Sequence, residues 1–165
     1  MDWWLVILIA AVPTYFVWAI LHECSHLIAA HAIIGITKVI KFIVWPWKVD
    51  GVLRFGWVQY QLKRKSTKME MAQVAKSPTI MHDLLFPAIV LTTVFMDHTS
   101  TVYRFLTVAL CGGLVDSFVW NLGIRKGTDI QKAYPTARSR IVERVVNYLQ
   151  IAVVGGYVVI TNFFV

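Results

Sequence analysis

Residues 3–34 read WWLVILIAAVPTYFVWAILHECSHLIAAHAII, an apolar stretch with a small polar cluster in its second half. In a helix that rises about 1.5 Å per residue, this stretch exceeds the ~30 Å hydrocarbon core of a bilayer. Length and composition therefore predict a membrane-spanning helix that contains the polar cluster. Ionisable side chains in such a helix are costly, and they usually face a protein interior or a watery cavity where they have a function.

The rest of the chain is similarly apolar. Of its 165 residues, 58% are hydrophobic and only 15% are charged, which is more apolar than a soluble domain of this size. Three further stretches, at about 79–96, 101–124 and 145–165, are long enough to cross a bilayer. We therefore predict an all-α membrane protein with about four transmembrane helices, the first at about 3–34, in a single domain covering residues 1–165.

The basic residues are distributed unevenly. Of the sixteen Lys and Arg residues, nine fall between Gly35 and Ser77 and six between Arg125 and Arg144. These intervals follow the first and third predicted spans, so four spans place them on one side of the membrane. An excess of positive loops is typical of the cytoplasmic side, so we expect both loops to be cytoplasmic and both termini to face the opposite side. This distribution favours contact with membrane lipids over nucleic acid.

Residues 39–62 predict a membrane-associated β-hairpin after the first helix. They are rich in Val, Ile, Phe, Trp and Tyr, and turn-forming residues lie at 46–51. Two interpretations remain open. The hairpin could bind an unwound substrate strand along its edge, or it could lie on the membrane surface. Residues 66–76 read as a basic interfacial segment, and residues 125–144 as a connector with a short helix.

The polar cluster is His22-Glu23-Cys24-Ser25-His26, an H-E-x-x-H sequence. Histidines at positions i and i+4 project from the same helix face, so both imidazoles can bind one metal ion. The glutamate beside the first histidine can act as general base on a metal-bound water. Such a pattern arises by chance in roughly three of a thousand chains of this composition. We therefore predict a zinc site with His22 and His26 as ligands and Glu23 as the catalytic base.

A catalytic zinc site usually has three protein ligands and one open position. Asp116 lies in the third predicted span at the same distance from its presumed cytoplasmic end as His26 lies in the first. We therefore predict Asp116 as the third metal ligand. His82 and Asp83, near the start of the second predicted span, remain alternative ligands.

The H-E-x-x-H sequence in the first span, the aromatic hairpin, Ser77-Pro78 before the second span and the acid at Asp116 together resemble the site-2 protease family of intramembrane zinc metalloproteases. The resemblance covers most of residues 3–124 and implies a minimal, divergent member. It implies that His22, His26 and Asp116 bind Zn²⁺, that Glu23 activates water, and that the substrates are transmembrane proteins.

These observations together predict an intramembrane zinc metalloendopeptidase that hydrolyses membrane-embedded protein segments. The alternative is a non-enzymatic membrane protein that binds metal for structure, transport or an accessory role. Only the first hypothesis requires Glu23 as a base.

Overall fold

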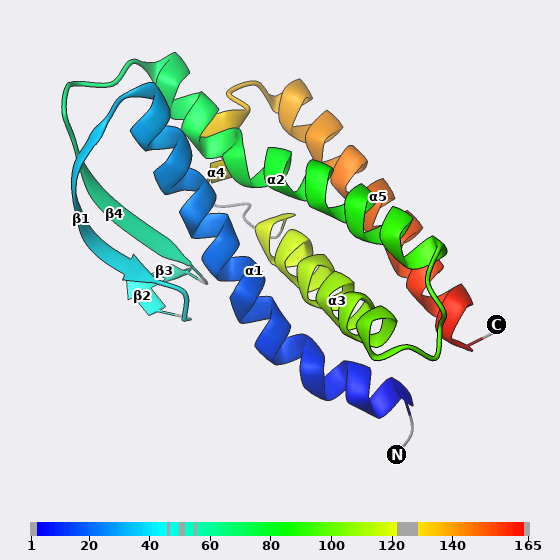
Figure 1. Cartoon of the computed structure of the whole chain (residues 1–165). Coiled ribbons are helices and arrows are strands. Elements are labelled where there is room, and N and C mark those ends of the chain that lie inside the picture. Colours follow the sequence, from blue (N-terminus) through cyan, green and yellow to red (C-terminus); the bar gives the residue numbers. More distant parts are fainter. Residues whose placement is uncertain (1–2, 46, 50–51, 55, 122–128, 164–165) are drawn as a thin grey trace. The chain divides into compact units, whose positions relative to one another are not determined.

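The structure is a computed structural model that describes residues 3–45, 47–49, 52–54, 56–121 and 129–163. Four of its helices are long and apolar enough to cross a membrane, and a small antiparallel hairpin follows the first of them. The predicted all-α membrane fold with a β-hairpin is therefore confirmed. The elements in chain order are α1 (Trp3–Ile33), β1 (Ile36–Ile43), β2 (Trp47–Val49), β3 (Val52–Arg54), β4 (Trp57–Leu62), α2 (Lys68–Val94), α3 (Thr101–Asn121), α4 (Asp129–Ala133) and α5 (Ala137–Phe163) (Figure 1).

Contacts within the chain divide it into two compact units. The first unit consists of Met1–Trp18, His82–Leu122 and Val142–Val165. The second consists of Ala19–Met81 and Gly123–Ile141. That residues 1–165 form a single metalloprotease-like domain stays a prediction.

In the first unit, small residues let α3 approach α1 and α2 closely. The indole N–H of Trp18 donates a hydrogen bond to the carbonyl oxygen of Ala109, at 2.7 Å. A β-carbon at Gly112 would collide with Thr14, and one at Gly113 would collide with Trp18 and with a ring of α2. These glycines are therefore required by the close packing of the three helices.

In the second unit, α1 leads directly into the hairpin. Gly35 adopts a positive φ of 87°, and its N–H donates to the carbonyl of Ala30, which ends the helix. Strands β1 and β4 then pair antiparallel, with Ile36 opposite Leu62 at the base. Strands β2 and β3 form a separate pair between them. The predicted hairpin at 39–62 is present, and its first strand begins slightly earlier, at Ile36.

Helix α2 begins at Lys68, well before the predicted start near residue 79, and it includes most of the expected interfacial segment. A capping box sets this start, because the backbone N–H of Thr67 donates to Glu70 and the N–H of Glu70 donates to the Thr67 hydroxyl. Arg64 donates to Glu70 at 2.6 Å and to the carbonyl of Ile33 at 3.2 Å. The start of α2 is thereby tied to the end of α1.

Helix α5 likewise begins at Ala137 instead of near residue 145. The hydroxyl of Thr136 accepts a hydrogen bond from the backbone N–H of Ser139, which caps the helix. Both early starts lie in polar sequence, so a search for apolar spans misses them. The short helix expected between 125 and 144 is α4.

Candidate metal centre

The polar cluster of α1 is buried in the second unit. His22, Glu23 and His26 have exposed fractions of 8%, 5% and 5%. The rings of His22 and His26 lie on adjacent turns, with their centroids 5.2 Å apart. This arrangement follows from the i, i+4 spacing, and it places two imidazoles side by side.

The two ring nitrogens of His26 have different partners. Nδ1 lies 2.9 Å from the carbonyl oxygen of Val74 in α2, and Nε2 lies 3.3 Å from a carboxylate oxygen of Asp129 in α4. A carbonyl oxygen can only accept, so we assign a proton to Nδ1. Nε2 can then meet the carboxylate of Asp129 in two ways, as the N–H of an imidazolium ion or through a lone pair with a metal ion between the two atoms. Among the described residues, Nε2 is buried without a hydrogen-bond partner.

His22, His26 and Asp129 form a group that could hold a metal ion, because one ligand atom from each lies within 4.8 Å of the others. Tetrahedral zinc with bonds of 2.0–2.1 Å places its ligand atoms about 3.3 Å apart. The His26–Asp129 distance already has this value. Two imidazoles and one carboxylate are a typical ligand set for a site with one open position. The residues present therefore fit a divalent transition metal.

The surroundings of Asp129 favour its charged, metal-binding form. Burial alone would raise the pKa of this carboxyl group, but the close contact with His26 and the charge of Lys132 hold the pKa well below its usual value. The ammonium group of Lys132 lies 3.5 Å from the second carboxylate oxygen. One oxygen of Asp129 therefore faces His26 while the other faces Lys132.

A cavity of about 430 Å³ opens beside this group in the second unit. Glu23, His26 and Asp129 line it together, so the predicted base shares the cavity with two of the candidate metal ligands. A β-carbon at Gly56 would collide with the Glu23 carboxylate, so the chain passes Glu23 closely at that point. The other lining residues come from β4, α2, α4 and the segment before α2: Trp57, Val58, Gln59, Tyr60, Leu62, Ser66, Met71, Val74, Ala75 and Lys132.

Tyr60 of β4 adds a hydroxyl group to the cavity wall. Its ring packs against Ala30, Ile34 and Val74, which fixes its position. Burial, followed by the negative charges of Asp129 and Glu23, raises the pKa of Tyr60 above its ordinary value. The hydroxyl therefore stays protonated as a hydrogen-bond donor.

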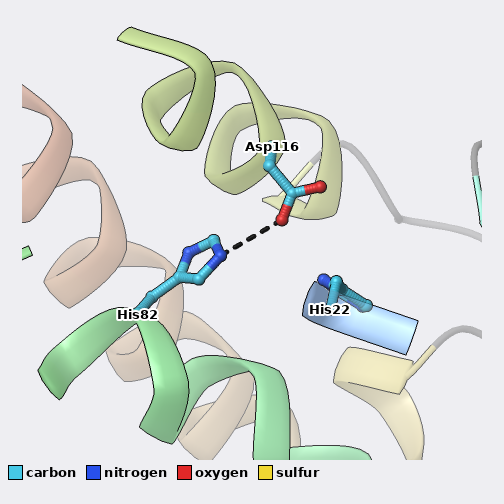
Figure 2. A group of neighbouring side chains, drawn as sticks. All are labelled: His22, His82 and Asp116. Carbon is cyan, nitrogen blue, oxygen red and sulfur yellow. Dashed lines mark ion pairs between the residues drawn. The ribbon is translucent and has the colours of Figure 1, made fainter. Parts of the chain in front are cut away.

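The predicted third ligand, Asp116, lies in the first unit. Its carboxylate is 3.1 Å from Nε2 of His82, and Nδ1 of His82 is 2.6 Å from the hydroxyl of Ser117 (Figure 2). The rings of Trp18 and Phe86 pack against the same imidazole, with centroids at 5.1 Å from it. The structure thus pairs Asp116 with His82, one of the alternative ligands. That Asp116 binds a metal ion together with His22 and His26 stays a prediction.

The remaining alternative ligand, Asp83, accepts a long hydrogen bond of 3.4 Å from Gln150 of α5. Asp83 is exposed, unlike its neighbour His82, which is 4% exposed. Neighbouring positions on α2 therefore have different environments, and Asp83 belongs to the contact between α2 and α5.

Sequence reasoning missed Asp129, because only acids inside the predicted spans were compared by membrane depth. Its short helix does carry a signal in the sequence. Ile130 and Ala133 are apolar residues at i and i+3 within a polar loop, and both are buried in the structure. Such a pair indicates a helix with one buried face, which would have brought the neighbouring acid into consideration.

Comparisons of the chain with protein-family models, with curated proteins and with solved structures find no match. The functional argument therefore depends on the geometry of the described residues.

Proposed function

We propose that the protein is an intramembrane zinc metalloendopeptidase that cleaves membrane-embedded protein segments. The observation that carries this proposal is the position of Glu23, which lies on α1 beside two histidines and lines the same cavity as His26 and Asp129. His22, His26 and Asp129 would hold the zinc ion. Bound zinc would supply a Lewis acid that polarises the scissile carbonyl and lowers the pKa of water.

Glu23 would act as the general base and then as the general acid. Its carboxylate takes a proton from a water molecule in the cavity as the water oxygen bonds to the peptide carbonyl carbon. The same proton then passes to the peptide nitrogen as the C–N bond breaks, which gives a carboxylic acid and an amine. The remaining proton of the acid then moves to the amine, which gives a carboxylate and an ammonium group. Burial of Glu23 at 5% exposure keeps this proton transfer away from bulk water.

Asp129 and Asp116 are the two candidates for the third ligand. Asp129 is favoured because its carboxylate meets Nε2 of His26 within the second unit and because its low pKa keeps the carboxylate ionised. Asp116 already has His82 as a partner in the first unit. The variants Asp129→Ala and Asp116→Ala distinguish the two assignments, because only the loss of the true ligand should weaken zinc binding strongly.

We propose a transmembrane protein segment as the substrate, held in extended form. Among the described strands, β4 pairs only with β1, which leaves its other edge without a strand partner. Trp57, Val58 and Tyr60 of β4 line the cavity together with Glu23. An extended substrate chain could add to such an edge, and the apolar wall would receive its side chains. By the positive-inside pattern, we propose that the basic loops of this region face the cytoplasm.

Substitution of Glu23 by Gln tests the proposal. We expect the variant to keep about one zinc per chain and to lose cleavage of transmembrane-segment peptides, because Gln cannot accept the proton. Zinc would be measured in purified protein and cleavage by mass spectrometry of a pooled peptide library. Glu143→Gln on α5, outside the cavity residues, is the matched control and should leave both unchanged. A wild-type protein that binds zinc but cleaves nothing in the library would instead support the non-enzymatic metal-binding alternative.

A further inference from the structure

Pro78 interrupts the hydrogen bonding of α2 near the candidate metal centre. In an α-helix, each backbone carbonyl accepts a hydrogen bond from the N–H group four residues later. The residue four positions after Val74 is Pro78, which has no N–H group. The carbonyl oxygen of Val74 therefore has no regular donor within its own helix.

Two side chains bind this carbonyl oxygen instead. Nδ1 of His26 donates to it at 2.9 Å from α1, and the hydroxyl of Ser77 donates to it at 2.8 Å from α2. A carbonyl oxygen has two lone pairs, so these two donors fill its capacity. A third donor, such as an amide N–H at position 78, would compete with His26.

We propose that Pro78 is a positioning residue for the metal centre, because its missing N–H keeps the Val74 carbonyl available to His26. This hydrogen bond fixes the proton on Nδ1 and turns Nε2 toward Asp129. Metal-binding histidines commonly donate their second ring nitrogen in this way, and loss of the acceptor typically weakens metal binding 10- to 100-fold. The inference rests on the proposed function, since it concerns the same metal site.

A second proline in α2 provides a control for the restored N–H group, although it differs from Pro78 in burial, since the Pro78 ring is fully buried. Pro87 also lies inside the helix, and it is exposed. The residue four positions before it is Asp83, whose side chain pairs with Gln150 and which lies in the other compact unit. Replacing either proline by Ala restores an N–H and relieves the steric cost of proline in a helix. Only at position 78 would the new N–H compete with a candidate metal ligand.

The experiment compares Pro78→Ala, Pro87→Ala and the wild type in the full chain in detergent micelles. Zinc affinity is measured by chelator competition, and stability by thermal unfolding. We expect Pro78→Ala to lower zinc affinity at least tenfold while its melting temperature stays equal or rises. Pro87→Ala should leave zinc affinity within twofold. A gain in helix stability together with a loss of zinc affinity is the signature of competition for the carbonyl.

Three results would overturn the inference. They are unchanged zinc affinity in Pro78→Ala, a fall in affinity accompanied by a lower melting temperature, and an equal fall in Pro87→Ala. The first excludes competition, the second indicates a packing role, and the third indicates a general effect on α2. If the wild type binds no zinc, the proposed function fails. The ¹⁵N spectrum of His26 in metal-free protein then decides the inference, since Pro78→Ala should reduce the form protonated at Nδ1.

Discussion

The molecule contains two pairs of histidine and aspartate with similar spacing and different chemistry. His26 and Asp129 are 3.3 Å apart in the second unit, and His82 and Asp116 are 3.1 Å apart in the first. His82 and Asp116 are both buried, whereas the Asp129 side chain is 34% exposed. The partner of Nδ1 makes the difference. In His26 this partner is a backbone carbonyl, which only accepts, so Nδ1 carries a proton and Nε2 meets the carboxylate either as an imidazolium N–H or through a bound cation.

In His82 the partner of Nδ1 is the hydroxyl of Ser117, which can donate. The proton of the ring can then reside on Nε2, beside the carboxylate of Asp116. The rings of Trp18 and Phe86 pack against the His82 imidazole, whereas a cavity with Glu23 in its wall adjoins the other pair. The partner of Nδ1 and the adjoining cavity, and not the distance to the carboxylate, therefore distinguish the two pairs.

Substitution of Asp129 by Ala tests the first pair and should give the largest effect. Removal of a direct ligand should lower zinc affinity by more than about 100-fold, since loss of outer hydrogen bonds alone costs up to about 100-fold. Chelator competition on the purified protein measures this affinity. If Asp129→Ala binds zinc as tightly as the wild type, Asp129 is not a metal ligand, and the two pairs do not differ in metal binding.

Substitution of Asp116 by Ala is the corresponding change in the second pair. It leaves the buried His82 without its carboxylate, so we expect a loss of about 1–3 kcal/mol in the free energy of unfolding, with zinc affinity retained. Unfolding would be followed in mixed micelles with increasing denaturing detergent. Asp83→Ala, at an exposed acid of the same unit, should have a smaller effect. A selective loss of zinc in Asp116→Ala would instead establish Asp116 as the third ligand, as the sequence predicts.

Substitution of Gly56 by Ala tests the cavity that distinguishes the first pair. The added β-carbon would displace the Glu23 carboxylate, so we expect kcat for a cleaved peptide to fall about tenfold, as for a misplaced catalytic group. Zinc content should not change. Gly156→Ala is the control, because a β-carbon there meets no atom within 4 Å. Equal rates in the two variants would show that Glu23 tolerates the displacement or has no catalytic role.

The smallest effect is expected from Lys132→Met. The Lys132 side chain is 45% exposed, so its ion pair with Asp129 should contribute less than about 1 kcal/mol, which corresponds to at most about fivefold in zinc affinity. Lys132→Arg should retain most of this contribution. Zinc titrations at low and high salt should show a smaller difference in affinity between the wild type and Lys132→Met at high salt, because salt screens exposed ion pairs. A fall above about tenfold would mean that Lys132 orients Asp129 more strongly than an exposed pair can.

The sequence predicts the local part of the structure well. Apolar length finds the membrane-crossing part of each long helix, and the fixed i, i+4 geometry places His22 near His26. Apolar length does not predict the starts of α2 and α5, because capping residues such as Thr67 set them in polar sequence. It does not predict contacts between distant residues either. Asp129 approaches His26 through the packing of a short helix. The spacing of Ile130 and Ala133 indicates the buried face of that helix, but it does not indicate the residue that the face packs against.

The His26–Asp129 pair also has a consequence for the biogenesis of the protein. About one hundred residues separate the two positions, and α2 and α3 lie between them. At a synthesis rate of roughly 5–20 residues per second, the ribosome completes Asp129 roughly 5–20 s after His26. During that interval the histidines are already in the nascent chain without this carboxylate. The hydrolytic site that we propose would therefore be assembled only after three spans have been made, which delays activity until most of the protein is in the membrane.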